Sequence, residues 1–364
     1  MFPRFLRAFY LALAIIAIVG LPCAAQQAPM PATAEGDFVV HNFQFHSGES
    51  LPELRLHYTT LGKPARDAKG NVTNAVLILH GTGGSGKQFL APQFAGELFG
   101  PGQLLDATKY FIILRDGIGH GKSSKPSDGL HAHFPQYDYD DMVAADYHLL
   151  KDGLGVNHLR LVLGTSMGCM HSFVWGETYP DFMDALMPLA CLPVQIAGRN
   201  RLWRKMTIEA IRGDPAWKGG DYTTEPQQAL RTVEDFLLIA GSAPLVMQKN
   251  LPTRDAADNY LDQAYKNNLA NLDANDFLYQ VSASRNYDPS TQLDKIKAPV
   301  MYINSADDFI NPPELGIAER EVQHIKNARF ILIPASEQTH GHGTHTWAAI
   351  WKQYLAELLE KSAH

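Results

Sequence analysis

Apolar residues along this chain gather in short, nearly continuous runs separated by longer segments of mixed character. The strand-length runs are 75–80, 110–116, 159–164, 185–191, 300–304 and 330–335. Continuous apolar runs are typical of strands buried on both faces, as in a parallel sheet covered by helices. The pattern therefore predicts an α/β fold, with a mostly parallel central sheet and helices on both of its faces.

Two earlier segments, 38–45 and 54–60, alternate apolar and polar residues. That alternation predicts two strands, which we expect to pair as an antiparallel hairpin at the edge of the sheet. The first part of the α/β core should then cover 37–194, and the second part should cover 291–364.

Between about 195 and 290 the strand pattern stops, and amphipathic segments containing Trp and Arg follow. We expect a helical cap over 195–290. Ligands in open α/β sheets bind at the carboxyl ends of the strands, so this cap should wall the site. The candidates to line its entrance are Arg199, Arg201, Trp203 and Arg204.

The first residues have the pattern of a secretory signal peptide. Arg4 and Arg7 precede an uncharged apolar run, which is followed by small residues ending at Ala25. The run is short for a membrane span, and Pro22 disfavours a lipid anchor on Cys23. We expect a signal peptide over 1–25, a linker over 26–36 and an exported, periplasmic or secreted protein without a stable membrane anchor.

Export would leave two cysteines, Cys169 and Cys191, in the mature chain. An oxidising compartment permits a disulfide, but both residues lie in apolar surroundings, where Cys often acts as a small hydrophobe. We expect two free, buried thiols. The formal net charge of -7 argues against nucleic-acid binding, which needs clustered Lys and Arg.

The strongest chemical motif is Gly164-Thr165-Ser166-Met167-Gly168, which matches G-x-S-x-G between a predicted strand and a predicted helix. In this motif the Ser occupies a sharp strand-to-helix turn that exposes its hydroxyl. A Ser hydroxyl needs an adjacent base to act as a nucleophile. We therefore expect an acid and a His further along the chain, in that order.

Both partners follow predicted strands. Asp307 and Asp308 come after 300–304, and we favour Asp308 as the acid because Pro312 follows it by four residues. His340, His342 and His345 come after 330–335, and we favour His342 because it lies between two glycines. The predicted catalytic triad is Ser166, Asp308 and His342, with the other candidates left open.

The stretch His80–Phe89 resembles a phosphate-binding loop, but Gln88 stands where that loop needs Ser or Thr. Because it follows the strand 75–80, it should instead supply one N–H of an oxyanion hole, with the residue after the nucleophile supplying the other. We expect these donors to be the amides of Thr82 and Met167. The "HGHGTH" stretch suggests a metal site, but the triad already accounts for His342, and we expect neither metal nor cofactor.

The chain also resembles the homoserine O-acetyltransferase family of α/β-hydrolases. The segments that carry the likeness are "FPQYDYDDMVAADYHLLKDGLGVNHLRLVLGTSMGCM", "EAIRGDPAWKGGDYTTEP" and "LDANDFLY", and it extends over most of 75–360. The resemblance implies the α/β-hydrolase fold, the same triad, and an acyl-serine intermediate whose acyl group passes to an acceptor.

Two departures separate the chain from that family. Gly343 follows the candidate His, where the family usually has Asp, and Asn271 stands where it has Arg before F-D-A-N. Those charges suit an amino-acid acceptor. We therefore expect an exported serine hydrolase that cleaves a carboxylic ester, or a related acyl bond, of a small to medium substrate through an acyl-serine intermediate. The alternatives are an O-acyltransferase using the same triad and a catalytically idle binding protein, and the sequence leaves a homodimer open.

Overall fold

The structure is a computed structural model that describes residues 32–363. The strands are β1 (Thr33–Gln44), β2 (Ser50–Leu61), β3 (Ala75–Leu79), β4 (Phe111–Arg115), β5 (Leu161–Thr165), β6 (Leu186–Leu189), β7 (Val300–Ser305) and β8 (Ala328–Ile333). The helices are α1 (Pro92–Leu98), α2 (Tyr139–His148), α3 (Met167–Thr178), α4 (Gly198–Gly213), α5 (Gln227–Gly241), α6 (Pro244–Asn250), α7 (Arg254–Asn268), α8 (Ala274–Ser282), α9 (Ile317–Glu321) and α10 (Ala348–Lys361).

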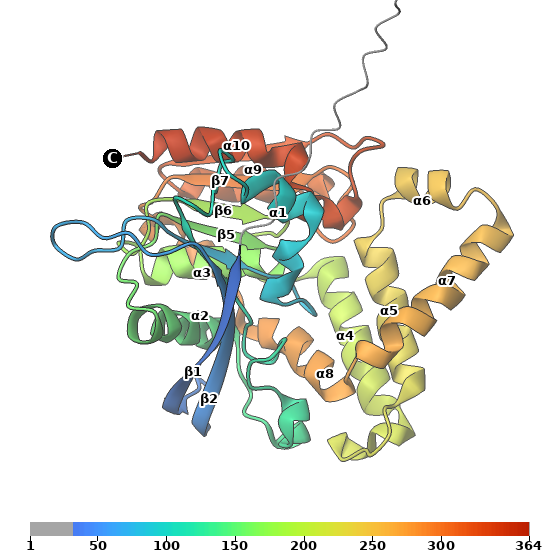
Figure 1. Ribbon diagram of the computed structural model, residues 1–364. Coiled ribbons are helices and arrows are strands. Elements are labelled where there is room, and N and C mark those ends of the chain that lie inside the picture. The colour runs from blue at the N-terminus through green and yellow to red at the C-terminus, as the bar shows by residue number, and fades with distance from the viewer. Residues whose placement is uncertain (1–31, 364) are drawn as a thin grey trace, which may run out of the picture.

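All the predicted strands enter one eight-stranded sheet, in the order β1-β2-β4-β3-β5-β6-β7-β8. The strands from β3 to β8 are parallel to one another, and β1 and β2 form the predicted antiparallel hairpin at the edge. Helices α1 and α10 pack on one face, and α2, α3 and α9 pack on the other (Figure 1). The predicted α/β-hydrolase fold is confirmed.

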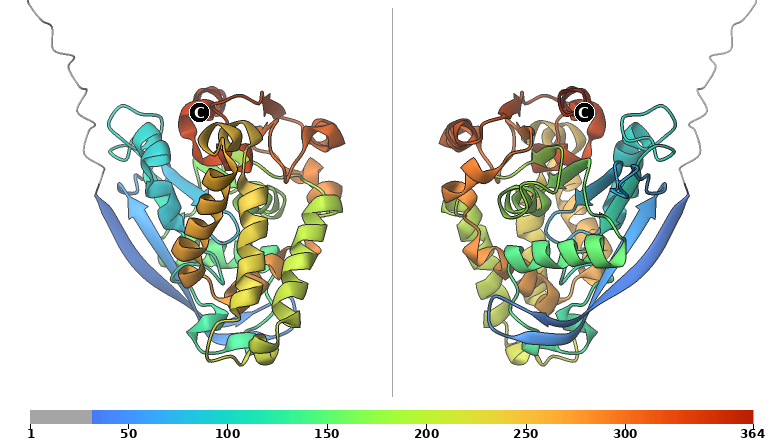
Figure 2. Two further views of the ribbon diagram at one scale, coloured as in Figure 1. Left: turned by 90° about the vertical axis from the view of Figure 1, so that its right-hand side faces the viewer. Right: turned by 90° about the vertical axis from the view of Figure 1, so that its left-hand side faces the viewer.

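Five of the helices, α4 to α8, follow β6 and precede β7 in the chain, and they project to one side of the sheet (Figure 1). Helices α4, α5 and α7 run side by side in this layer (Figure 2, left). The layer has its own apolar core, which includes Trp203, Ile211, Leu230 and Phe277. We call α4–α8 the cap.

The N-terminal predictions have different outcomes. The predicted signal peptide lies outside the described residues. The predicted linker 26–36 was too long, because β1 begins at Thr33 and pairs with Leu61 of β2, so residues 33–36 belong to the sheet. Within residues 32–363, no helix is long and apolar enough to cross a membrane.

Candidate active site

Ser166 occupies the turn between β5 and α3. Its φ of 56° lies in the left-handed region, which a non-glycine residue enters only at a cost. The two glycines of the motif allow the turn to close: a Cβ at Gly164 would overlap the Gly168 carbonyl, and a Cβ at Gly168 would overlap the Leu79 carbonyl. The hydroxyl therefore stands at the carboxyl edge of the sheet, ahead of the first turn of α3.

The structure brings the three predicted triad residues into one hydrogen-bonded chain. The Nε2 atom of His342 lies 2.8 Å from the Ser166 Oγ, and its Nδ1 lies 2.9 Å from the Asp308 Oδ2. With the Nδ1–H donating to the carboxylate, Nε2 is free to accept the serine proton. This is the arrangement that makes a Ser hydroxyl nucleophilic.

Asp308 is buried and fixed by several donors. Its Oδ1 accepts from the Ile310 amide at 2.8 Å, and its Oδ2 accepts from the Asn311 side chain at 2.9 Å. Burial by itself would raise the pKa of Asp308, but the charge and hydrogen bond of His342 and the Asn311 contacts lower it below the ordinary value. The carboxylate therefore stays ionised and can stabilise an imidazolium at His342.

Asp307, the alternative acid, contacts the loop that carries His342 rather than its ring. It accepts from the Thr339 hydroxyl at 2.7 Å and from the Gly341 amide at 3.1 Å. Of the alternative bases, His340 stacks on Trp347 with ring centroids 3.9 Å apart. Burial lowers the pKa of His345 to about 3. The chain of contacts with the Ser166 hydroxyl thus favours Asp308 and His342 over the other predicted candidates.

The predicted oxyanion donors lie beside the hydroxyl. Thr82 is in the turn that follows β3, closed by a hydrogen bond of 3.0 Å from the Gly84 amide to the Gly81 carbonyl. A Cβ on Gly81 would come within 3.1 Å of the Ser166 Cβ, so this turn passes directly over the nucleophile. Met167 begins α3, where a first-turn N–H has no partner within its own helix.

A buried network below this turn was not predicted from the sequence. The His80 Nδ1 donates to the Gly81 carbonyl at 2.8 Å, while its Nε2 accepts from Arg115 at 3.0 Å and from the Gly117 amide at 3.0 Å. Burial, reinforced by the Arg115 charge, lowers the pKa of His80 well below its ordinary value. His80 is therefore neutral, and it ties the oxyanion turn to the core.

Cys169 and Cys191 form a disulfide, so the prediction of two free thiols was wrong. Cys169 is in the first turn of α3 and Cys191 follows β6, and the neighbouring strands β5 and β6 bring their Cα atoms to 5.8 Å. That separation lies within the usual disulfide range. Apolar surroundings alone could not reveal this pairing, because it depends on strand order.

Two cavities adjoin the triad. A small one of about 120 Å³ is lined by Ser166, His342 and Thr82, together with Trp203 and Arg204 of α4. A larger one of about 860 Å³, lined mainly by apolar side chains, lies between the cap and the loop after β7. The two share Met170, Asn200 and Ile310 as lining residues.

Three of the four predicted entrance residues line these cavities. Arg199 lines the larger cavity, where its guanidinium stacks on the Phe309 ring at 4.2 Å from the centroid. Trp203 and Arg204 lie deeper, beside Ser166. Arg201 is exposed on the outside of α4.

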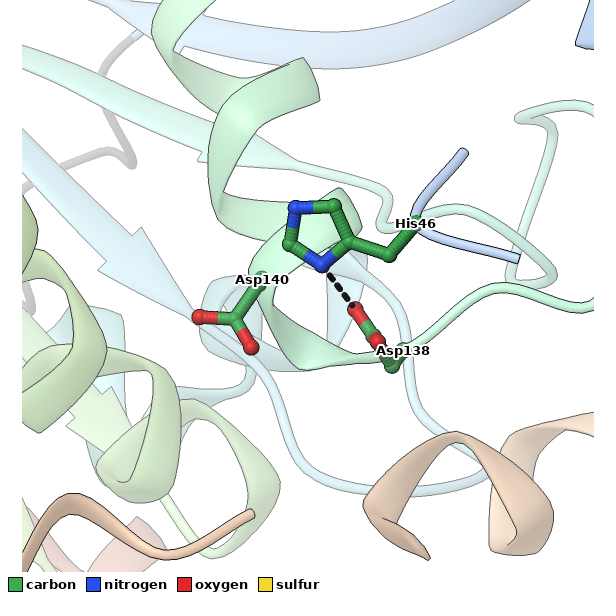
Figure 3. A group of neighbouring side chains, drawn as sticks. All are labelled: His46, Asp138 and Asp140. Carbon is green, nitrogen blue, oxygen red and sulfur yellow. Dashed lines mark ion pairs between the residues drawn. The ribbon is translucent and has the colours of Figure 1, made fainter. Parts of the chain in front are cut away.

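Among residues 32–363, one group of three side chains is spaced so that it could share a metal ion, namely His46, Asp138 and Asp140. Figure 3 shows the His46 ring turned toward Asp138. The His46 Nδ1 lies 3.5 Å from the Asp138 Oδ1. Asp138 already caps α2 by accepting from the Asp141 amide, and its other oxygen accepts from Asn286. The cluster is thus explained as the start of a helix, and the three His of 340–345 form no such group.

Comparisons with known proteins place the chain in a family. Residues 74–338 match the model of the alpha/beta hydrolase fold family. The chain is 30% identical to a probable acyltransferase of Methanothermobacter thermautotrophicus, over 81% of this chain and 89% of that protein. It is 31% identical to the homoserine O-acetyltransferase of Moorella thermoacetica, over 86% and 93% respectively.

The fold is also similar to the crystal structure of the acetyl esterase MekB, with a TM-score of 0.77 at 25% identity, over 91% of this chain and 97% of that one. The relatives are thus esterases and acyltransferases that share one architecture. The chain belongs to the α/β-hydrolase fold family, as a homoserine O-acetyltransferase-like enzyme.

Proposed function

We propose that this enzyme is a serine hydrolase that cleaves a carboxylic ester through an acyl-serine intermediate. Ser166 attacks the ester carbonyl while His342 takes its proton, and His342 then protonates the leaving alcohol. The amides of Thr82 and Met167 bind the oxyanion, and each such donor is worth about 3–4 kcal/mol in the transition state. Water then releases the acid. The observation that carries the proposal is the hydrogen-bonded chain from Asp308 through His342 to Ser166.

The larger cavity supports hydrolysis over transfer from coenzyme A. Among its lining residues Arg199 is the one cation, whereas Asp307, Asp308 and Glu314 are acids. A donor with several phosphates would meet more negative than positive charge there. The family's Arg before F-D-A-N and its Asp after the catalytic His are also absent, at Asn271 and Gly343.

The second candidate is an O-acyltransferase with the same triad, which the homoserine O-acetyltransferase relative favours. The test is to assay the mature protein and its Ser166→Ala variant on short p-nitrophenyl esters, then on acetyl-CoA with homoserine. We expect ester hydrolysis that is lost in Ser166→Ala. Hydrolysis that survives in the variant would overturn the proposal, and homoserine-dependent release of coenzyme A would establish the transferase.

We also propose that the protein is exported by its N-terminal segment. The Cys169–Cys191 disulfide supports this, because structural disulfides persist mainly in oxidising compartments. Cell fractionation and N-terminal sequencing of the recovered protein test it. A mature protein that begins after Ala25 outside the cytoplasm is expected, and an uncleaved cytoplasmic protein would refute export.

A further inference from the structure

Arg204 is a buried cation without a carboxylate partner. It is 2% exposed, its Nε donates to the Asn200 side chain at 2.9 Å, and its Nη1 donates to the Ser284 hydroxyl at 3.1 Å. Both of these acceptors are neutral. Within residues 32–363, no carboxylate lies at ion-pair distance from its guanidinium. Arginine is almost never fully buried unless it is paired, so Arg204 is placed to bind an anion that enters the cavity.

Arg115 is a buried arginine with which the surroundings of Arg204 can be compared. It is the other arginine among the buried residues of the described chain, and its Nε donates to the Asp146 carboxylate at 2.9 Å. The fold therefore provides a counter-charge for the buried arginine in its core. It provides none for the buried arginine that lines the cavity of Ser166.

Two hydroxyl groups beside Arg204 are also without partners. The Tyr139 Oη and the Thr82 Oγ1 are buried and make no hydrogen bond. Burial raises the pKa of Tyr139, while the nearby Arg204 charge and the Ser284 and Thr82 hydroxyls oppose that rise. The guanidinium and the three hydroxyls thus lie together, although they come from four separate segments of the chain. Ser284 already donates to the Val281 carbonyl at 2.9 Å, so the guanidinium and the Tyr139 and Thr82 hydroxyls are the groups that can donate to a ligand.

We propose that Arg204, together with the hydroxyls of Tyr139 and Thr82, binds a carboxylate carried by the substrate. The inference rests on the proposed hydrolase and narrows its substrate class to esters that bear a carboxylate a few atoms from the scissile bond. A guanidinium pairs with a carboxylate through parallel charge-assisted hydrogen bonds, and the hydroxyls donate to the remaining lone pairs. The small cavity has room for a short chain, and the larger apolar cavity receives the rest of the molecule.

The carboxylate can belong to the acyl part or to the alcohol part of the ester, and two matched pairs of substrates separate these cases. The acyl pair is monomethyl succinate and methyl isohexanoate. The alcohol pair is acetylglycolate and isobutyl acetate. In each pair a carboxylate replaces an isopropyl group of similar shape, and acid release is followed in a pH-stat.

We expect the wild type to prefer the carboxylate member of one pair by about 10- to 100-fold in kcat/KM. The pair that shows the preference identifies the end of the substrate that lies beside Arg204. Arg204→Gln should abolish the preference and Arg204→Lys should retain part of it. Arg212→Gln, an exposed control on α4, should leave the preference unchanged. Wild-type preference for the neutral member of both pairs, or an undiminished preference in Arg204→Gln, would overturn the inference.

Two further measurements distinguish failure of this inference from failure of the proposed hydrolase. Ser166-dependent hydrolysis of the neutral esters without any carboxylate preference would refute this inference and leave the proposed hydrolase intact. If Arg204→Gln does not fold, competitive inhibition of the wild type by succinate and by succinamide replaces it. Stronger inhibition by succinate supports the subsite, and equal inhibition refutes it.

Discussion

At the scale of single residues, the site depends on which neighbouring carboxylate and which neighbouring His face the nucleophile. The sequence placed both Asp candidates and all three His candidates after the correct strands. The choice among them depends on short contacts: Asn311 and the Ile310 amide turn Asp308 toward His342, whereas Asp307 binds the loop at Gly341. The contacts to Ile310 and Asn311 are local, but those of Asp308 to His342 and of Asp307 to Gly341 join residues 34 positions apart. A sequence pattern can suggest such long-range contacts but cannot choose between them.

Asp308→Asn should lower kcat for ester hydrolysis by about 10⁴, because the amide no longer holds the His342 ring in the productive tautomer. Asp307→Asn should cost much less, since Asp307 positions the loop and does not touch the ring. Steady-state kinetics of both purified variants measure the difference. An equal or larger loss in Asp307→Asn would show that the acid was assigned to the wrong residue.

His80 gives a test of the oxyanion turn. An Asn side chain can replace the Nδ1–H donor to the Gly81 carbonyl, whereas a Gln side chain reaches the position of Nε2 and leaves that carbonyl without its donor. We expect His80→Gln to lower kcat by about 10- to 100-fold with a smaller change in KM, and His80→Asn to retain more activity. If the two variants lose kcat equally, the contact to Gly81 does not position the turn.

At the scale of elements, the parallel order of β3, β5 and β6 brings the functional segments to one edge. The sequence predicted these strands because their apolar runs are continuous, and it predicted the G-x-S-x-G turn because of where the glycines lie. It could not predict the disulfide, because the contact between α3 and the segment after β6 depends on β5 and β6 being neighbours. Local patterns predict elements, whereas pairings between elements depend on topology.

The disulfide should contribute measurably to stability. It joins residues separated by 22 positions, and closing a loop of that length in the unfolded chain corresponds to about 3 kcal/mol. We expect the double variant Cys169→Ser/Cys191→Ser to lose about that much free energy of unfolding in urea titrations. Unchanged stability of the double variant, relative to the oxidised wild type, would contradict this contribution.

Glu177 of α3 makes the stability of the folded protein depend on pH. Burial, and then the Asp140 charge, raise the pKa of Glu177 from 4.5 to about 8. The folded protein therefore holds this proton more tightly than the unfolded chain does. Its contribution to stability is fully present below pH 4.5 and is lost as the pH rises through about 8.

Glu177→Gln removes that titration and keeps a neutral side chain of similar shape. We expect the variant to gain stability relative to the wild type as the pH rises from about 5 to about 8, with no further gain above that range. Urea unfolding of both proteins across this range provides the measurement. A constant difference between them at all pH values would show that Glu177 does not titrate in this way.

At the scale of the whole molecule, the segments at the carboxyl edge of the sheet carry the hydrogen-bonded chain of Ser166, His342 and Asp308, and the cap lines the two cavities beside it. The sequence predicted a helical segment between two parts of the core, and it named Arg204 as an entrance residue. The depth of Arg204, beside Ser166, depends on how α4 packs over the sheet, and periodicity along the chain carries no information on that packing. The sequence therefore predicted the fold of the core in more detail than the packing of the cap over it.

The central claim is that Ser166 carries the acyl group during the reaction. The direct measurement is mass spectrometry of the protein quenched in acid within the first turnovers of p-nitrophenyl acetate, followed by proteolysis to locate the modification. We predict one added acetyl group on the peptide that contains Ser166, and none in Ser166→Ala. An acetyl group on another residue would contradict the account, as would a burst of p-nitrophenol without any acetylated enzyme.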